Sequence, residues 1–399
     1  MNVVFLHPDL GIGGAERLIV DAAVALKQKE YQVKIITNHH NKDHCFPETR
    51  DGTLNVEVHG MWIPRSFFGR FIAFLAYVKM ICAALCLVIF REKPDIIIVD
   101  QVSAPIPVLR WFTNAKILFY CHFPDLLLTG RQSFVKRLYR SVIDPIEEVT
   151  TSMAHKHLVN SDFTRRVFKT TFKSISSEPE ILYPSINLLA FDREYDVSIQ
   201  DVIPDYRSDQ EVFLSINRYE RKKNLPLALK AFGHFIQNLS PDVQKKYRLI
   251  MAGGYDERVE ENVTHYKELV NLSVELGVAS HTTFLKSPSE PVKILLLKMA
   301  RALIYTPDKE HFGIVPLEAM YCRTPVIAVN SGGPMETIID GVTGFLTKDE
   351  PELFSDAMKK VVSNEISGVS MGNAARTRVE QFFSFNAFAN SLNRILQEM

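Results

Sequence analysis

The stretch NVVFLHPDLGIGGAERLIVDAAVALKQK, residues 2–29, decides the fold. Residues 2–7 are a nearly continuous apolar run, which is typical of a strand buried on both faces of a parallel sheet. Residues 15–29 carry apolar side chains at helical spacing, and a glycine-rich turn separates the two segments. Strand, turn and helix in this order begin a βαβ unit, so the sequence predicts a parallel sheet covered by helices.

The same alternation runs through the rest of the chain in two blocks. In the first block, further strands are predicted at residues 33–38, 95–101, 116–122 and 156–162. A polar stretch near residues 193–210 follows. The second block then opens with strands at 211–217 and 247–254 on either side of a helix at 225–237. This rhythm predicts two doubly wound α/β domains of similar size.

The expected domain boundaries follow from the polar stretch. We expect a first domain at 1–190, a linker at 191–210, and a second domain at 211–399 that includes the terminal helices. Ligands of doubly wound sheets bind at the carboxyl ends of the strands. Two Rossmann-like domains are therefore expected to face a central cleft.

Composition excludes some classes of partner. The chain has 46 basic and 46 acidic residues, so its formal net charge of zero gives no bulk electrostatic argument for binding nucleic acid. The five cysteines form no CxxC pair, which indicates a reducing compartment.

The turn GIGGAER, residues 11–17, admits two interpretations. Gly13 and Gly14 could let backbone N–H groups approach a phosphate or sugar at the start of a helix. The turn could also be no more than a tight strand-to-helix connection. A nicotinamide fingerprint is excluded because Glu16 occupies the position of the third glycine.

The segment NRYERKKN, residues 217–224, follows the first strand of the second block. Arg218 and Lys223 lie five positions apart at a strand end, where two cations suit a diphosphate. A solvated basic turn is the other interpretation of the segment.

The segment EHFGIVPLE, residues 310–318, places two carboxylates eight positions apart. On one helix they would be ~12 Å apart along the axis, too far for a carboxylate dyad or a shared metal. Pro316 suits the first position of a helix, so we expect Glu318 in the first turn and Glu310 in the preceding loop, beyond Gly313. Two separated acceptors suit a ligand rich in hydroxyl groups.

Two other features concern a strand end and a membrane. His122 ends a predicted strand, where it is either structural or functional.

Residues 71–90 are long and apolar enough to span a bilayer, but they lie between two strands of one sheet. We therefore predict a helix packed partly on the sheet and partly in the membrane interface, with a fully buried crossover helix as the alternative. The basic segment 130–140 suits lipid phosphate or a solvated helix face.

These motifs together resemble the retaining GT-B glycosyltransferases of glycosyltransferase family 4. HPDLGIGGAERL, ILFYCHFPDLLLT, SINRYERKKN and EHFGIVPLEAMY look, within that family, like the mannosyltransferases of asparagine-linked glycosylation. The resemblance implies GDP-mannose as donor and a dolichol-diphosphate-linked mannosyl-chitobiose as acceptor, which receives an alpha-1,3 and then an alpha-1,6 mannose. It also implies the cytosolic face of the endoplasmic reticulum membrane, with other dolichol-pathway mannosyltransferases as partners. A related transferase that uses a UDP-sugar on a lipid-linked acceptor is the alternative among enzymes. A two-domain α/β ligand-binding protein is the alternative outside enzymes.

The resemblance also implies roles for individual residues. Arg218 and Lys223 would hold the donor diphosphate, Glu318 the ribose and Glu310 the mannose hydroxyls, while His122 would orient the transferred sugar. Gly313, Gly332 and Gly333 would belong to the donor site, and Gly13, Gly14 and Glu16 would line the cleft on the acceptor side. No metal and no other cofactor is expected.

Overall fold

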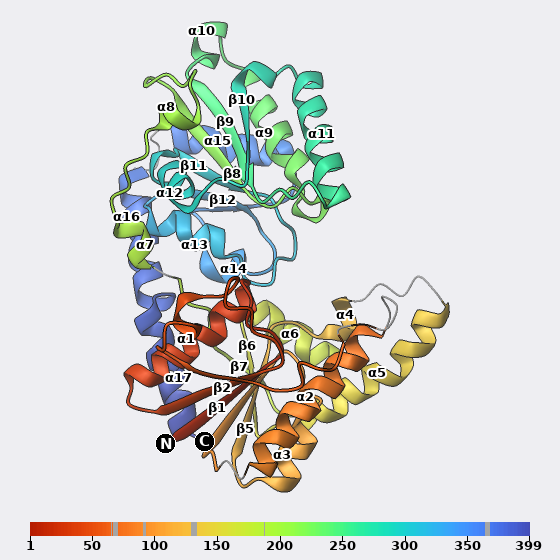
Figure 1. The fold of residues 1–399 in the computed structure, drawn as a ribbon. Helices are drawn as coiled ribbons and strands as arrows, with labels where there is room; N and C mark the ends of the chain where they lie inside the picture. The colour runs from red at the N-terminus through yellow and green to blue at the C-terminus, as the bar shows by residue number, and fades with distance from the viewer. Residues whose placement is uncertain (65, 67–70, 91–92, 129–133, 187, 364–367) are drawn as a thin grey trace. The chain divides into compact units, whose positions relative to one another are not determined.

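The chain folds into two compact units. The computed structural model describes residues 1–399 except 65, 67–70, 91–92, 129–133, 187 and 364–367 (Figure 1). Residues Met1–Ser185 and Phe385–Met399 form the first unit, and Ile186–Ser384 form the second. Both units are α/β, as the sequence predicts.

The first unit is built on a parallel sheet in the order β3-β2-β1-β4-β5-β6-β7. Its strands are β1 (Asn2–His7), β2 (Gln32–Thr37), β3 (Asn55–Val58), β4 (Ile96–Asp100), β5 (Lys116–Cys121), β6 (Lys156–Val159) and β7 (Glu180–Ile181). Its helices are α1 (Gly14–Gln28), α2 (Ile72–Ile89), α3 (Ile106–Phe112), α4 (Asp125–Leu128), α5 (Phe134–Ser152), α6 (Asp162–Thr171) and α17 (Phe385–Gln397), with a 3₁₀ turn at Pro47–Thr49. Successive strands are added on one side of β1 up to β3 and on its other side from β4 onward, so the switch point lies between β1 and β4.

Alternation along β1 explains why helices cover both faces of this sheet. Val3 and Phe5 point into a core that α1 and α17 complete, whereas Val4 and Leu6 point into a core that α2, α3 and α6 complete. Figure 1 shows α1 and α17 on one side of the sheet and α2, α3 and α5 on the other. The predicted helix at 71–90 is therefore α2, and it is a crossover helix packed on the sheet.

The second unit repeats this architecture with six parallel strands in the order β10-β9-β8-β11-β12-β13. The strands are β8 (Glu211–Ile216), β9 (Tyr247–Gly253), β10 (Thr282–Lys286), β11 (Ala302–Tyr305), β12 (Val326–Val329) and β13 (Phe345–Thr347). The helices are α7 (Leu188–Asp192), α8 (Ile199–Val202), α9 (Leu225–Gln237), α10 (Pro241–Gln244), α11 (Glu260–Glu275), α12 (Glu290–Met299), α13 (Ile314–Tyr321), α14 (Pro334–Thr337), α15 (Pro351–Val362) and α16 (Gly368–Phe382), with 3₁₀ turns at Arg221–Lys223 and Ala279–His281. The switch point lies between β8 and β11.

The units differ from the expected boundaries 1–190, 191–210 and 211–399 in one main respect. Helix α17 belongs to the first unit, where Phe388, Leu392 and Ile395 pack in the same core as Leu18 and Leu26 of α1. Helical periodicity identifies the apolar face of a helix but not the sheet that this face covers. The polar stretch 191–210 is also part of the second unit, because the boundary along the sequence falls between Ser185 and Ile186.

Candidate active site

The two predicted cations of the second unit lie in the loop that follows β8. The Nζ atom of Lys223 is 2.5 Å from Glu310 Oε2, and the lysine side chain is only 12% exposed. Arg218 instead lies with its Nη1 atom 2.9 Å from Glu220 Oε1, and its side chain is 61% exposed. The structure therefore joins Lys223 to Glu310 and leaves the Arg218 guanidinium on the surface beside Glu220.

Strand β11 ties these two loops together at its carboxyl end. The Thr306 hydroxyl donates a hydrogen bond of 2.7 Å to the Lys223 carbonyl oxygen. The pKa of the buried Tyr305 phenol is raised well above its ordinary value, first by burial and then by the charge and hydrogen bond of Glu310. Tyr305 and Thr306 were not predicted as site residues. Their signal in the sequence is a polar pair at the end of a switch-point strand.

The helix after Gly313 begins earlier than the sequence suggests. Gly313 has a φ of +84° and α13 starts at Ile314, so Pro316 is its third residue rather than its first. Proline is tolerated there because the first N–H groups of a helix have no partner within it. Glu318 is consequently the fifth helical residue, and its predicted place in the first turn is wrong.

Glu318 is a buried carboxylate held by one lysine. Its Oε1 atom accepts a hydrogen bond of 2.8 Å from Lys293 of α12, and Oε2 has no hydrogen-bond partner among the described residues. Burial raises the pKa of Glu318, and Lys293 offsets that effect only in part. Lys293 was not predicted, because nothing local in the sequence connects it with Glu318.

Two glycines bring the loop after β12 against the Glu310 loop. The Gly333 N–H donates to the Glu310 carbonyl oxygen at 2.8 Å. A Cβ atom on Gly332, which has a φ of +62°, would lie 2.3 Å from that same oxygen, and one on Gly333 would lie 2.0 Å from the Phe312 carbonyl oxygen. The Gly333 amide, expected to approach the donor, thus already binds the neighbouring loop.

The first unit holds a chain of three polar side chains at its own switch point. His7 ends β1, Asp100 ends β4 and His122 follows β5. The Asp100 carboxylate is completely buried, with His7 Nδ1 at 2.7 Å and His122 Nε2 at 2.9 Å. Burial alone would raise the pKa of Asp100, but the two imidazoles outweigh it and lower that pKa. Only His122 was predicted as a site residue; His7 and Asp100 lay within the predicted strands 2–7 and 95–101.

The glycine turn of the first unit opens α1. Gly13 is the residue before the helix and Gly14 is its first residue. The Glu16 side chain folds back over Gly13, where an added Cβ would lie 2.2 Å from Glu16 Oε2. A carboxylate beside a helix N-terminus is favourable. The turn therefore holds its own anion.

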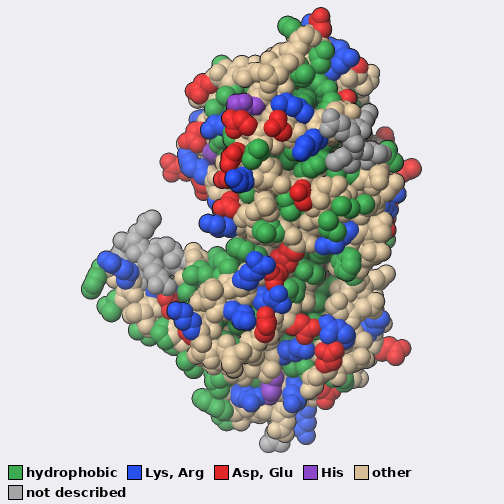
Figure 2. Space-filling view, turned by 180° about the vertical axis from the view of Figure 1, so that it is seen from behind, with side chains coloured by type: hydrophobic (Ala, Val, Ile, Leu, Met, Phe, Trp, Pro, Cys, Tyr) green, Lys and Arg blue, Asp and Glu red, His purple; other side chains and the backbone are tan. Residues whose placement is uncertain are grey.

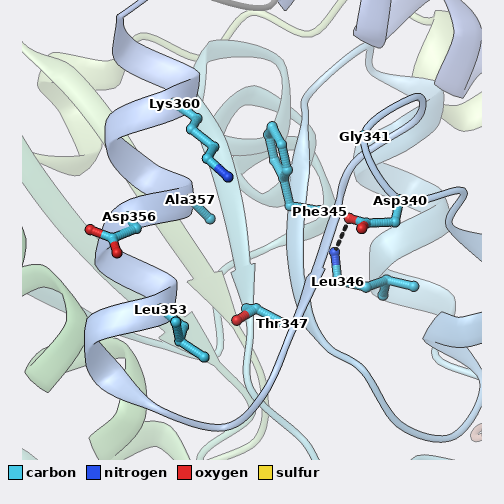
Figure 3. A pocket seen from close by; sticks show the side chains of 9 residues that line it. All are labelled: Asp340, Gly341, Phe345, Leu346, Thr347, Leu353, Asp356, Ala357 and Lys360. Atoms are coloured by element: carbon cyan, nitrogen blue, oxygen red, sulfur yellow. Dashed lines mark hydrogen bonds between the residues drawn. The ribbon is translucent and has the colours of Figure 1, made fainter.

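A separate cavity of about 470 Å³ lies in the second unit beside β13 and α15 (Figure 3). Its lining residues are Asp340, Gly341, Phe345, Leu346, Thr347, Leu353, Asp356, Ala357 and Lys360. None of the predicted site residues is among them. The described residues also contain no group of three His, Cys, Asp or Glu side chains that could hold a metal ion. The expected absence of a metal stays a prediction.

Comparison with known proteins places the chain in a family. Residues 12–188 match the model for Glycosyltransferase Family 4, and residues 199–378 match that for glycosyl transferases group 1. The protein named alpha-1,3/1,6-mannosyltransferase ALG2 is 50% identical in Mus musculus, with 100% of this chain and 96% of the relative covered. The protein of the same name in Saccharomyces cerevisiae is 39% identical, with 100% and 85% covered.

Solved structures agree on the fold. Sucrose-phosphate synthase from Thermosynechococcus elongatus has a TM-score of 0.76 at 18% identity, covering 100% of this chain and 98% of that one. HepE of Anabaena in complex with UDP has a TM-score of 0.75 at 16% identity, covering both chains fully. With its GT-B fold and its full-length relatives, the chain belongs to glycosyltransferase family 4 and, within it, to the family of alpha-1,3/1,6-mannosyltransferases named ALG2.

Proposed function

We propose that the protein transfers mannose from GDP-mannose to Man1GlcNAc2 linked to dolichol diphosphate. It adds an alpha-1,3 mannose and then an alpha-1,6 mannose, giving the Man3GlcNAc2 precursor of protein N-glycosylation. The observation that carries this proposal is the likeness to the mouse alpha-1,3/1,6-mannosyltransferase, which extends over the whole chain at 50% identity.

Lys223 and Arg218 are the proposed binding groups for the donor diphosphate. Both side chains are cationic and follow β8 at the switch point, where ligands of doubly wound sheets bind. Their charge would stabilise the negative charge that develops on GDP as it leaves, and the proposed reaction then needs no metal or other cofactor. The diphosphate would compete with Glu310 for Lys223, which would free Glu310 to accept a hydrogen bond from a mannose hydroxyl.

Glu318 is the proposed acceptor for the ribose of the nucleotide. Its buried Oε2 atom lacks a hydrogen-bond partner among the described residues, while Lys293 fixes the other oxygen. An unsatisfied buried oxygen is costly. A ribose hydroxyl that donates to it would remove that cost on binding.

His122 is proposed to orient the transferred sugar. Its Nε2 atom faces the Asp100 carboxylate, so Nδ1 is the ring atom available to a substrate. Transfer with retention then proceeds on one face of the sugar. The bond from the anomeric carbon to the diphosphate breaks, the bond to the acceptor oxygen forms, and the acceptor proton passes to the leaving diphosphate. A trapped covalent glycosyl-enzyme would contradict this step.

The membrane is part of the proposal because the acceptor is a lipid. Helix α2 has a mean hydropathy of 2.5, and 28% of its residues are buried. Among the described residues it is the one helix whose length and composition could cross a membrane. Since α2 connects two strands of one sheet, we propose that it lies in the membrane interface on the cytosolic face of the endoplasmic reticulum.

Product analysis tests the proposed function. Purified protein would be incubated with GDP-mannose and mannosyl-chitobiose on a lipid diphosphate in liposomes, beside Glu310→Ala. Two added mannoses that disappear in the variant support the proposal, with inhibition by GDP but not by UDP. Wild-type protein that binds GDP and makes no product would overturn it, and stronger inhibition by UDP would favour the UDP-sugar alternative.

A further inference from the structure

Helix α5 is inverted relative to a helix that faces water. From Leu138 to Ser152, its exposed residues are Leu138, Ser141, Val142, Pro145, Ile146, Val149 and Ser152, and none of them is charged. The charged side chains of this stretch are buried or half-buried, with Arg140 at 2% and Glu147 at 8% exposure. A surface helix normally places charged residues outward and apolar residues inward.

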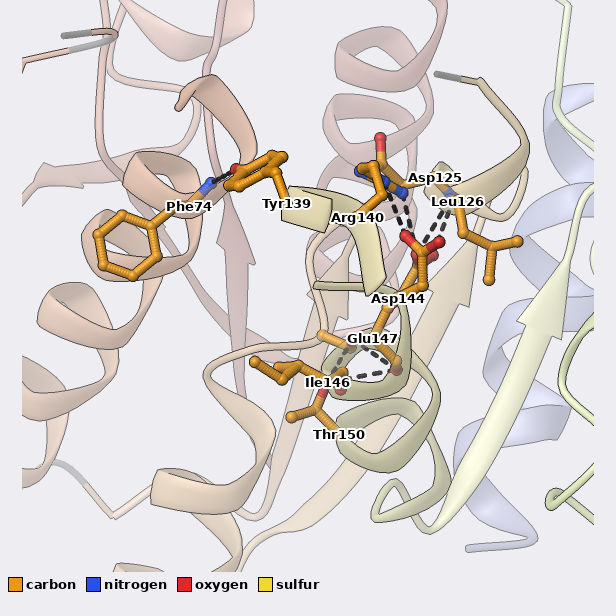
Figure 4. Close-up of polar contacts among 10 residues, drawn as sticks. Phe74, Asp125, Leu126, Tyr139, Arg140, Asp144, Ile146, Glu147 and Thr150 are labelled. Atoms are coloured by element: carbon orange, nitrogen blue, oxygen red, sulfur yellow. Dashed lines mark hydrogen bonds and ion pairs between the residues drawn. The ribbon is translucent and has the colours of Figure 1, made fainter. Parts of the chain in front are cut away.

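The inward charges have a structural explanation. Arg140 lies 2.7 Å from both Asp125 and Asp144, and the Glu147 carboxylate accepts the N–H groups of Asp125 and Leu126 (Figure 4). This polar cluster holds the short helix α4, which follows His122. It accounts for the inner face of α5 and does not account for the apolar outer face.

The outer face of α5 carries large apolar side chains that the fold leaves exposed. Phe134, Leu138, Val142 and Val149 are between 59% and 72% exposed. They recur at intervals of four or more residues along one side of the helix. A row of this kind marks a surface that another apolar phase covers.

This row continues onto two neighbouring helices. Tyr77 of α2 and Ile143 of α5 share a small buried cluster, and the Phe74 N–H of α2 donates to the Tyr139 hydroxyl of α5 at 2.8 Å (Figure 4). Helix α3 packs against both. We call the exposed apolar side chains of the three helices the apolar platform: Phe71, Ile72, Phe74, Leu85, Ile89 and Phe90 on α2 or its ends, Trp111 and Phe112 on α3, and Phe134, Leu138, Val142, Ile146 and Val149 on α5. Figure 2 shows hydrophobic side chains along the edge of the first unit where these helices lie.

We propose that α5 is a second membrane-binding helix and that the apolar platform rests in the interface of a phospholipid bilayer. Protein interfaces are only modestly more apolar than the remaining surface and have a polar rim, whereas from Leu138 to Ser152 no exposed residue of α5 is charged. Trp111 is an aromatic residue of the type enriched at the membrane–water interface. The exposed Arg137, at the start of α5, adds attraction to anionic headgroups. The platform also includes exposed residues of α2, the apolar helix of membrane-spanning length.

Matched variants of the full-length protein test this inference. Val142→Glu/Val149→Glu places two charges on α5, at positions that are 61% and 59% exposed. Val274→Glu/Val369→Glu makes the same change on α11 and α16, where the exposures are 64% and 75%. In flotation with phosphatidylcholine vesicles that contain phosphatidylserine, we expect the partition coefficient of the α5 variant to fall about tenfold or more, and that of the control to stay at the wild-type value.

Tryptophan quenching gives a second measurement. The chain has two tryptophans, both exposed: Trp62 at 82% and Trp111 at 71%. In the Trp62→Phe protein, vesicles with brominated acyl chains should quench Trp111, and the α5 variant should reduce this quenching. Trp111 fluorescence that brominated vesicles leave unchanged would overturn the inference.

The remaining outcomes separate this inference from the proposed function, on which it rests only for the lipid nature of the acceptor. An α5 variant that partitions like the wild type overturns the inference. So does a variant that loses self-association in sedimentation while its vesicle binding is unchanged, because a second copy would then cover the platform. Transfer to an acceptor on a short, water-soluble lipid reports the function alone. If vesicle binding depends on α5 but the wild-type protein makes no product, the proposed function is contradicted and the inference about α5 is supported.

Discussion

The carboxylate of Asp100 lies 2.9 Å from the Nε2 atom of His122. The aspartate is completely buried, whereas the histidine side chain is 22% exposed, so the pair leads from the core to the surface. On the buried side of Asp100, its Oδ2 atom lies 2.7 Å from His7 Nδ1. If His122 orients the transferred sugar, as proposed, Asp100 would act through it by facing Nε2 and fixing the plane of the ring.

Asp100→Asn removes the charge from this chain with almost no change in volume. We expect kcat for mannose transfer to fall about 100-fold, because His122 loses the partner that fixes its ring and tautomer. GDP affinity should be unchanged, since the groups proposed to bind GDP lie in the second unit. Kinetics across pH and calorimetry with GDP measure the two effects. Asp43→Asn, an exposed position, serves as control, and a kcat equal to that of the control would refute the role.

The adjacent lysines 222 and 223 offer a matched test of the donor site. Lys223 is 12% exposed and pairs with Glu310, whereas Lys222 is 66% exposed and pairs with Glu220. We expect Lys223→Ala to weaken GDP binding about 10- to 100-fold, the usual range for a lost charge-assisted hydrogen bond. Lys222→Ala should change it less than about threefold. Equal losses in both variants, measured by calorimetry, would mean that only the net charge of the loop matters.

Sequence periodicity predicts the strands and the crossover helices well. The apolar run at residues 2–7 is β1, and the helix expected at 15–29 is α1 at Gly14–Gln28. The fold of each unit follows from such local patterns, because a parallel sheet buries continuous apolar runs. The short strands β3 and β7 were not predicted, and nothing local says that residues 385–399, which contain α17, return to the first sheet.

Partners of the site residues could not be predicted, because they come from distant parts of the chain. Glu318 and Lys293 lie 25 positions apart on different helices, and His7 and Asp100 lie 93 positions apart. Position within a helix was also misjudged at Pro316, because the left-handed Gly313 starts α13 two residues earlier. The strand-end rule could have marked His7 and Asp100, since β1 and β4 flank the switch point.

Gly332 and Gly277 form a pair that separates backbone strain from loop packing. Their φ values are +62° and +68°, so alanine should cost about 1–2 kcal/mol of unfolding free energy at either position. An added Cβ meets nothing within 4 Å at Gly277 but lies 2.3 Å from the Glu310 carbonyl oxygen at Gly332. We expect Gly332→Ala to cost about 1–3 kcal/mol more in urea unfolding and to reduce transfer by displacing Glu310. Equal stability and activity in both variants would contradict this contact.

Glu147 gives the stability of the protein a specific pH dependence. Burial, and then the charge of Asp125, raise the pKa of Glu147 from 4.5 to about 7, although two N–H groups and Arg140 favour the carboxylate. At a pH between about 4.5 and 7, the folded protein therefore holds a proton on Glu147 that the unfolded chain has released. The stabilising contribution of this group is thus complete below about pH 4.5 and is lost as the pH rises through about 7.

The size of this effect can be measured against the next residue. At 1.36 kcal/mol per pKa unit, Glu147 should lower the unfolding free energy by at most about 3 kcal/mol between pH 5 and pH 8. Glu147→Gln cannot titrate, so its urea midpoint should fall less over this interval than that of wild type. Glu148→Gln, which alters the half-buried carboxylate that accepts the Ser174 N–H, should keep the wild-type slope. If both variants keep the slope, Glu147 is ionised throughout, and its bonds to the N–H groups of α4 outweigh burial.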